Sequence, residues 1–174
     1  VTVNDGAADS ASYDLSVTVT AVNDAPVITG QSPLTTPEDT ALTIALADLT
    51  VTDVDNTYPD DFTLTVADGA NYSHVGNTIT PALNFNGTLT VPVTVNDGTN
   101  TSASFDLSVT VTAVNDAPEI TGQHSVTTDE DTPVTPGLDD LIVTDVDNTY
   151  PGDFTLMVGD GANYTHVGNA ITPA

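Results

Sequence analysis

The sequence predicts an all-β protein made of Greek-key β-sandwiches of about 92 residues, arranged in tandem as a linear array. Three observations support this prediction. Apolar and polar residues alternate over short segments such as residues 105–113, as they do in strands with one buried face. Glycine, proline, asparagine and aspartate bound these segments. The pentapeptide Val-Asn-Asp-Ala-Pro at residues 22–26 recurs at residues 114–118, a spacing of 92 that other motifs share.

The 92-residue spacing divides the chain into three parts. We expect residues 1–23 to be the C-terminal strands of a preceding repeat, residues 24–115 to be a complete repeat, and residues 116–174 to be the N-terminal part of a following repeat. A unit of this length is at the small end of ordinary domains. Neighbouring repeats or bound ions are therefore expected to contribute to its stability.

Six or seven short strands are predicted in the complete repeat, with no helix. Residues 105–113 place apolar side chains at every second position, and residues 13–21 repeat that pattern. Gly76-Asn77 and Asp97-Gly98 are predicted tight turns. Pro26 and Pro118 are expected to be stiff, extended joints between units. The remaining predicted strands are residues 42–46, 49–52, 62–66, 71–75, 78–80 and 89–95.

The chain carries many negatively charged side chains and no lysine or arginine to balance them. It has no lysine or arginine and 25 acidic residues, which gives a formal net charge of −25. Its carboxylates must be neutralised by ions from solvent, and nucleic acid and anionic membranes are excluded as partners because both require Lys or Arg patches. Cysteine is absent, so disulfides and thiolate metal sites are excluded as well. No segment is apolar and long enough to predict insertion into a membrane.

Many of the carboxylates lie in short blocks at predicted strand ends. Asp53 and Asp55 are two positions apart, so their side chains share one side of an extended segment. Two like charges roughly 5 Å apart repel by about 0.8 kcal/mol even in water, and a hard divalent cation reverses that interaction. Calcium takes six to eight oxygen ligands and tolerates irregular geometry, which favours it over magnesium. The alternative is that these aspartates form solvated turns and cap loop amides.

The same two interpretations apply to Asp97-Gly98, where a hairpin turn and a ligand role are compatible. The histidines predict no catalysis. His74 and His166 are equivalent positions in polar strand segments, His124 has no equivalent, and no nucleophile and base recur around them. We therefore predict that the protein is not an enzyme and that these side chains have surface or packing roles.

The order and spacing of the acidic blocks resemble the calcium motifs of cadherin domains. Pro37-Glu38 resembles the Pro-Glu motif, and Asp53-Val54-Asp55 resembles the Asp-x-Asp motif. Residues 83–86 occupy the place of the Leu-Asp-Arg-Glu motif, residues 95–98 that of Ala-x-Asp-x-Gly, and residues 22–26 that of the linker. More closely, the chain is similar to the cadherin-like tandem repeats of giant bacterial RTX-type surface adhesins, which are exported by type I secretion and end in Val-Asn-Asp-Ala-Pro.

The resemblance implies junctions that are stiffened by Ca²⁺, bound between the end of one domain, the linker and the start of the next. Asn84 and Asn86 stand where the family has acidic residues, and the linker lacks its leading acid. These departures suit one or two Ca²⁺ ions better than three. The first junction would use Asn23, Asp24, Glu38, Asp53, Asp55 and Asp97, and the second would use Asn84, Asn86, Asn115, Asp116, Glu130, Asp145 and Asp147.

The function that this resemblance implies is an extracellular, cell-surface spacer that holds a distal adhesive domain away from the cell, with neighbouring repeats as its direct partners. Other domains would contact host-surface or biofilm glycans. Two alternatives belong to other classes. One is a carbohydrate-binding sandwich that uses loops with Tyr58, Asn71, Tyr72 and His74. The other is an extracellular filament in which the strand of one chain completes the open sheet edge of another.

Overall fold

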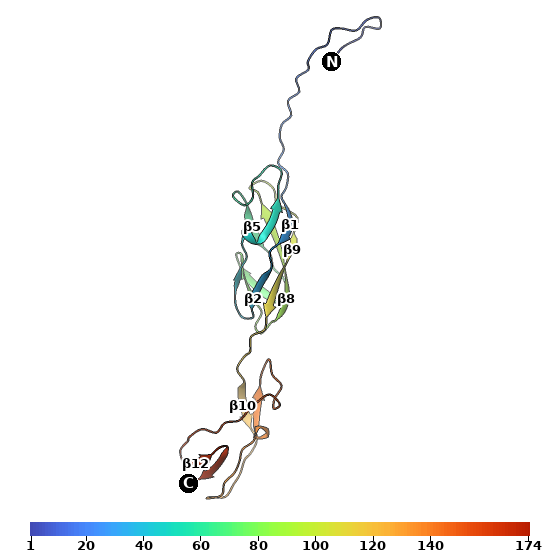
Figure 1. The fold of residues 1–174 in the computed structure, drawn as a ribbon. Coiled ribbons are helices and arrows are strands. Elements are labelled where there is room, and N and C mark those ends of the chain that lie inside the picture. The colour runs from blue at the N-terminus through green and yellow to red at the C-terminus, as the bar shows by residue number, and fades with distance from the viewer.

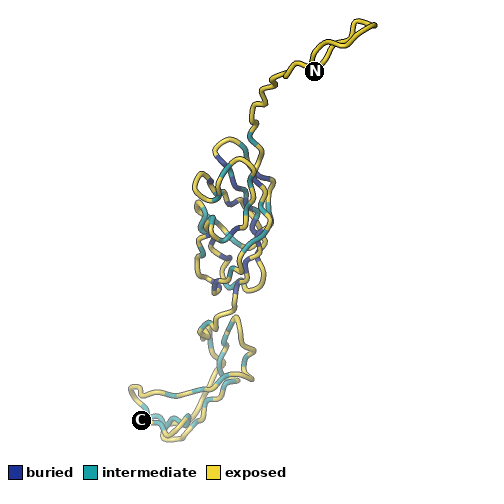
Figure 2. Tube along the Cα trace, turned by 45° about the horizontal axis from the view of Figure 1, so that its top comes forward, coloured by how far each residue is buried: buried dark blue, intermediate teal, exposed yellow.

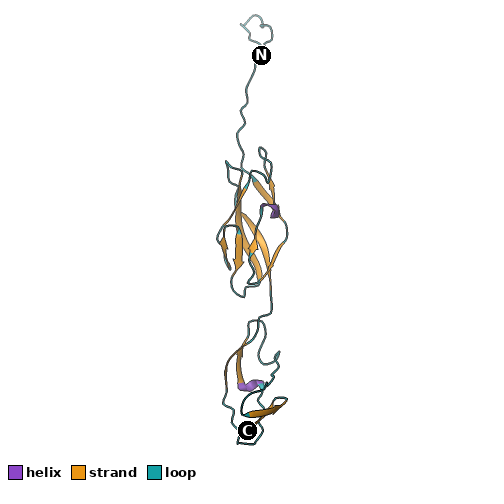
Figure 3. Cartoon of the chain, turned by 90° about the vertical axis from the view of Figure 1, so that its left-hand side faces the viewer, coloured by secondary structure: helices purple, strands orange, loops and turns teal.

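The computed structural model describes residues 1–174 as an elongated, nearly all-β molecule (Figures 1 and 3). An extended N-terminal segment leads into a sandwich, and a short linker connects the sandwich to a smaller C-terminal part. The elements of the sandwich are β1 (Val27–Gln31), β2 (Leu34–Pro37), β3 (Leu42–Thr43), the 3-10 helix η1 (Leu46–Asp48), β4 (Leu49–Thr52), β5 (Thr63–Val66), β6 (Tyr72–Val75), β7 (Thr78–Pro81), β8 (Gly87–Asn96) and β9 (Phe105–Thr112). The C-terminal part contains β10 (Glu119–Gln123), η2 (Leu138–Asp140), β11 (Leu141–Thr144), β12 (Tyr164–Val167) and β13 (Ala170–Pro173).

The sandwich is built around a four-stranded sheet in the order β2-β9-β8-β5. β8 and β9 pair in antiparallel fashion from Gly87 opposite Val111 to Val93 opposite Phe105, while β2 joins the other side of β9 in parallel. A three-stranded sheet, β3-β7-β6, and a two-stranded sheet, β1-β4, complete the fold. The all-β sandwich that the sequence predicts is therefore confirmed.

The core of the sandwich follows from the alternation in β8 and β9. Leu89, Val91, Val93 and Val95 of β8 are buried, and the residues between them are threonine or proline. β9 buries Leu107, Val109 and Val111 in the same way, and the other core members are Ile44, Leu49, Phe62, Val66 and Ile79. Every buried residue of the chain lies between Pro26 and Val111, as the dark blue segments of Figure 2 show. Burial of this apolar surface is the main force that stabilises the sandwich.

Several strand predictions are confirmed and others need correction. The strands predicted at residues 49–52, 62–66, 71–75, 78–80, 89–95 and 105–113 correspond to β4, β5, β6, β7, β8 and β9. Only residues 42 and 43 of the segment 42–46 form a strand, and η1 follows instead. β1 and β2 were not predicted. The short 3-10 helices also differ from the prediction that no helical stretch is present.

The strand predicted at residues 13–21 is not formed. The N-terminal segment contains only an isolated bridge between Asn4 and Asp9, and the apolar side chains of Tyr13, Leu15, Val17 and Val19 are all exposed. Tyr13 exchanges backbone hydrogen bonds with Val1, but no strand lies beside the rest of the segment to form hydrogen bonds with it (Figure 1).

The C-terminal part repeats the local structure of the sandwich. β10 pairs with β11 in the register of β1 with β4, including the same irregularity, and β12 pairs with β13 as β6 does with β7. Tyr58 and Tyr150 each stack edge to face on the phenylalanine four residues later, with ring centroids 5.1 and 5.2 Å apart. In these elements the sequence repeat is also a structural repeat, whereas residues 126–129 and 155–158, the counterparts of β2 and β5, form no strand.

Candidate cation sites at the repeat junctions

Polar side chains from three segments meet at the N-terminal end of the sandwich. The backbone N–H of Asp24 donates a hydrogen bond of 2.8 Å to Oδ2 of Asp55. The side-chain amide of Asn23 donates to Oδ2 of Asp97 at 2.9 Å. Asn100 closes the group, because its amide donates to the carbonyl oxygen of Asn23 at 2.9 Å. The linker is thereby attached to the loops that follow β4 and β8.

Asp53 has one oxygen that is used by the fold and one that is not. Its Oδ1 accepts 2.8 Å hydrogen bonds from the backbone N–H groups of Asp55 and Asn56, so Asp53 does cap loop amides. Its Oδ2 is buried without a hydrogen-bond partner, and so is Oδ1 of Asn56. Buried oxygens without partners are uncommon and costly, and they are the kind of ligand that a hard cation takes.

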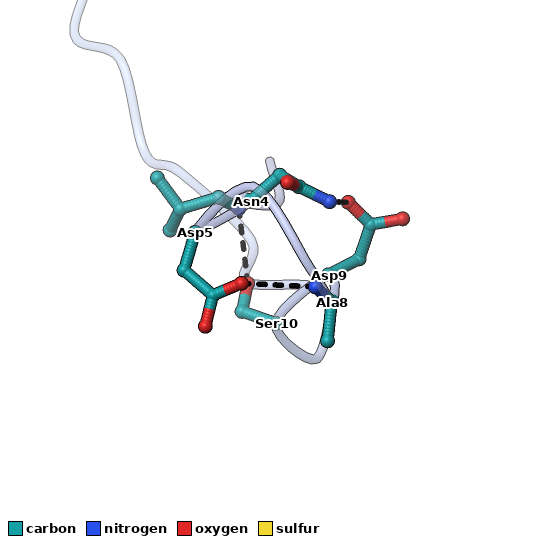
Figure 4. A pocket seen from close by; sticks show the side chains of 6 residues that line it. Asn4, Asp5, Ala8, Asp9 and Ser10 are labelled. Atoms are coloured by element: carbon teal, nitrogen blue, oxygen red, sulfur yellow. Dashed lines mark hydrogen bonds between the residues drawn. The ribbon is translucent and has the colours of Figure 1, made fainter.

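Asp97 forms a turn that is held by hydrogen bonds within the chain. The backbone N–H of Asn100, the side chain of Asn23 and the backbone N–H of Thr99 hold the pKa of Asp97 below its ordinary value. Figure 4 shows the copy of this turn near the N-terminus, where Oδ1 of Asp5 accepts a hydrogen bond of 2.9 Å from the N–H of Ala8. The N–H of Ala7 donates to the same oxygen at 2.9 Å. A hairpin role for the Asp-Gly segment is therefore part of the structure at both places.

The linker between the sandwich and the C-terminal part is held from both sides. The N–H of Val114 donates a hydrogen bond of 2.6 Å to Oε1 of Glu38, which is buried at the end of the sandwich where the chain leaves it. Two residues later, the N–H of Asp116 donates at 2.6 Å to Oδ2 of Asp147 in the C-terminal part. Alternate amides of one extended segment thus bind carboxylates from two different units.

The carboxyl group of Asp116 lies among other carboxylates. Its Oδ2 is buried and has no hydrogen-bond partner. Burial raises the pKa of Asp116 above its ordinary value, and the negative charges of Asp147, Asp39, Glu38 and Asp145 raise it further. A carboxylate that is destabilised by its neighbours in this way favours a proton or a cation at that position.

The structure changes the assignment of two predicted ligands. Glu38 was grouped with the first junction, but its contact with Val114 places it at the second. The reason is that β2 runs parallel to β9 and carries Glu38 to the end where the chain leaves the sandwich. Glu130, the counterpart of Glu38 in the repeat, makes no side-chain hydrogen bond to Asn115, Asp116, Asp145 or Asp147 and is exposed.

The other predicted residues are distributed as follows. Asn23, Asp24, Asp53, Asp55 and Asp97 lie together at the first junction, and Asn115, Asp116, Asp145 and Asp147 lie together at the second. The backbone N–H of Asn84 bonds to Oδ1 of Asp39 at 3.1 Å, which places its loop beside the second junction, whereas Asn86 is exposed and makes no hydrogen bond through its side chain. Sequence reasoning missed Asn56, Asn100 and the role of Asp39. Asn56 had a signal, because it recurs as Asn148 directly after the Asp-Val-Asp block.

No group of three or more His, Asp or Glu side chains stands close enough together to hold a metal ion in this structure. The carboxylates of Glu38, Asp55 and Asp147 are instead turned toward linker amides. The chemistry of the residues nevertheless fits calcium, since the three buried oxygens without partners belong to Asp53, Asn56 and Asp116.

Outside the junctions, four aromatic side chains make contacts within the fold, those of Tyr58, Tyr72, His74 and His166. The hydroxyl of Tyr58 donates to the carbonyl of Leu46, and that of Tyr72 donates to the carbonyl of Ala67 at 2.6 Å. His74 places Nδ1 3.0 Å from the carbonyl oxygen of Gly76 and Nε2 3.3 Å from Oδ1 of Asp68. His166 makes the equivalent contacts with Gly168 and Asp160.

The profile of the cadherin-like domain family matches residues 22–112, which is more than half of the chain. The chain therefore belongs to the cadherin-like domain family. Such domains are non-enzymatic adhesion or extender modules, are associated with the extracellular space, contact adjacent domains and typically bind calcium. No curated protein matches the chain. None of its helices has the length and apolar character needed to cross a membrane.

Proposed function

We propose that this chain is part of the extracellular spacer region of a large bacterial adhesin of the RTX type, in which calcium stiffens the junctions between repeats. In this proposal the repeat boundaries fall after Asn23 and after Asn115, and the array holds a distal adhesive domain away from the cell. Type I secretion and a role in biofilm formation belong to the same proposal. Other domains of the full protein would recognise glycans.

The observation that carries the proposal is the carboxyl group of Asp116. It is contributed by the linker, has a buried oxygen without a partner, and lies among carboxylates of both flanking units. A junction of this composition is repulsive unless a cation is present. The residues that would hold the ion there are Glu38, Asp39, Asp116, Asp145 and Asp147.

A bound calcium ion would supply positive charge and oxygen coordination that the chain itself lacks, because it has no lysine or arginine. The residues of the chain do the rest. Glu38 and Asp147 hold the linker amides at 2.6 Å, so the two units already have a preferred arrangement. Binding to that arrangement stabilises it by roughly 2.7 kcal/mol when free calcium is about a hundredfold above the dissociation constant.

At the first junction, Asp53 and Asn56 offer the two buried oxygens, and Asp55 and Asp97 accept hydrogen bonds from the linker residues Asp24 and Asn23. Extracellular calcium modules generally bind with dissociation constants of about 10⁻⁴ to 10⁻³ M. A chain with such junctions is flexible at cytosolic calcium and stiff outside the cell, which suits export before folding. Full occupancy at submicromolar calcium would contradict this part of the proposal.

The test is a set of thermal melts of residues 1–174, followed by far-UV circular dichroism, in EDTA, in millimolar calcium and in equal magnesium. We expect a rise in Tm that is specific to calcium and smaller in Asp116→Asn. Asp106→Asn is the matched control, because Asp106 is exposed on β9. Melts that coincide in all three solutions would reject calcium stiffening and leave the acidic blocks as solvated turns.

A second candidate is the filament, in which a strand of one chain joins the sheet of another. A cavity in the C-terminal part favours it. The cavity has a volume of about 350 Å³ and is lined by Gln123, Val126, Thr128 and Ile171, among others, where the complete sandwich has contacts between Gln31, β2 and β9. Residues 13–20, which repeat the sequence of β9 except for Tyr13 in place of Phe105, are exposed. Sedimentation at low and high protein concentration tests it, since a spacer stays monomeric and a filament grows.

A further inference from the structure

The sandwich contains a single parallel strand pair. It links β2, near the beginning of the sandwich in sequence, to β9, its last strand. β2 is the second strand after the chain enters and runs toward the end where the chain leaves, and β9 is the last strand before the linker. Leu34 to Pro37 of β2 lie opposite Val109 to Thr112 of β9 in parallel register. All other strand pairs of the sandwich are antiparallel.

Tension along the chain loads this pair in a specific direction. The chain enters the sandwich at one end and leaves it at the opposite end, so that the linkers point in opposite directions (Figures 1 and 3). A pull on the two linkers therefore draws β2 and β9 past each other along their own length. Parallel neighbours that are pulled in this way must break all their shared hydrogen bonds together, whereas a pair pulled apart from one end loses them one at a time.

Additional contacts lengthen the parallel pair on both sides. Before β2, the side-chain amide of Gln31 replaces a strand backbone: its Nε2 donates to the carbonyl of Ser108 at 2.7 Å, and its Oε1 accepts from the N–H of Ser108 at 2.7 Å. After β2, the N–H of Glu38 donates to the carbonyl of Thr112 at 2.9 Å. Glu38 then accepts from Val114 at 2.6 Å.

The pairing is therefore continuous from Gln31 with Ser108 to Glu38 with Val114. Pro37 is compatible with it. In a parallel ladder, alternate residues of a strand face the partner, and Glu38 faces β9, so Pro37 lies at a position where its missing N–H is not needed. β2 is also an edge strand, with β9 as its only neighbour in the sheet.

We propose that the parallel pairing from Gln31 to Glu38 along residues 108–114 is a mechanical clamp that bears tensile load on the chain, with Gln31 as a strength-determining residue. This function goes beyond that of a spacer, which needs only length and stiffness. It also does not rest on calcium, because every contact in the clamp is a direct hydrogen bond within the chain.

The C-terminal part provides a matched control for Gln31. Gln123 occupies the same position in β10, in the same register irregularity, but its side chain makes no hydrogen bond in this structure. Replacement of Gln123 therefore shows the effect of losing a glutamine at the equivalent position, where no hydrogen bond to a neighbouring strand is lost. Gln31→Glu keeps an oxygen that accepts from Ser108 but loses the group that donates to its carbonyl.

The experiment is single-molecule force spectroscopy of the full chain, held at both termini, in EDTA. Unfolding of residues 27–112 gives a length gain of roughly 250 to 290 Å, at about 3.4 Å for each residue released. In Gln31→Ala we expect the unfolding rate at a fixed force to rise roughly tenfold or more, because two hydrogen bonds are lost. Gln31→Glu is expected to be intermediate, and Gln123→Ala unchanged.

Far-UV circular dichroism and urea unfolding establish first that each variant is folded. An unfolding rate in Gln31→Ala equal to that of the wild type would overturn the clamp, and so would an equal effect of Gln123→Ala. A result in EDTA that matches expectation while the calcium melts coincide would retain the clamp and reject calcium stiffening. The two proposals can therefore fail separately.

Discussion

Substitution of Asp53 separates its structural role from its role as a ligand. Asp53→Ala removes two hydrogen bonds to loop amides, each worth about 1 kcal/mol, and also the repulsion from Asp55 of about 0.8 kcal/mol, so we expect the unfolding free energy to fall by about 1 kcal/mol in EDTA. For a domain of this size that corresponds to a Tm lower by roughly 4 to 8 °C. Both the cap and the ligand oxygen are lost in this variant.

Asp53→Asn retains the oxygen that accepts from Asp55 and Asn56, removes the charge and replaces Oδ2 by an NH2 group. The weaker acceptor is offset by relief of the repulsion from Asp55, about 0.8 kcal/mol at roughly 5 Å in water, so the Tm in EDTA should stay close to that of the wild type. The calcium-dependent rise should be largely lost, because an amide NH2 group, which does not bind a cation, takes the place of the buried Oδ2.

The assay is the thermal melt in EDTA and in millimolar calcium for the wild type, Asp53→Ala, Asp53→Asn and the control Asp106→Asn. Retention of the full calcium-dependent rise by Asp53→Asn would refute the assignment of Asp53 as a ligand. Equal losses in EDTA for both Asp53 variants would show instead that the charge, and not the accepting oxygen, stabilises the turn.

Three further predictions follow from the geometry. The pKa of Asp97 is lowered from 3.8, so the stability that it contributes is complete above about pH 4 and is lost as the pH falls through its folded pKa; urea unfolding of the wild type and Asp97→Asn should converge there. The pKa of Asp116 is raised, so Asp116→Asn should stabilise the junction in EDTA at neutral pH but weaken calcium binding roughly tenfold, measured by calorimetry. Gly69→Ala should lower the Tm strongly because a Cβ there would lie 2.5 Å from Cε1 of Tyr72, whereas Gly30→Ala should be tolerated at 3.9 Å from its nearest neighbour.

The sequence predicts the two central strands of the four-stranded sheet well because β8 and β9 alternate so regularly between apolar and polar residues. It does not predict β1 and β2, since Gly30 and Pro37 interrupt their patterns and both strands lie at sheet edges. Residues 13–21 illustrate the converse. Alternation shows which side chains share a face, but it does not show whether a partner strand is present.

The gathering of acidic blocks at the junctions was predictable, but their grouping was not. The blocks lie at strand ends and recur at a spacing of 92 residues, which identifies equivalent residues; cation binding by them stays a prediction. Proximity in sequence then placed Glu38 with the nearest linker, whereas the parallel course of β2 and β9 carries it to the other end. The unpartnered oxygen of Asn56 depends on how the loop after β4 folds back, which the sequence pattern does not specify.

The linker contacts have a consequence for how such an array can change its length. The second junction combines a glutamate of the sandwich, Glu38, with an aspartate of the C-terminal part, Asp147. In the proposed array, adding or removing one whole repeat would bring another unit that supplies the same two groups. The length of such an array would then change in fixed steps without new contacts at any joint.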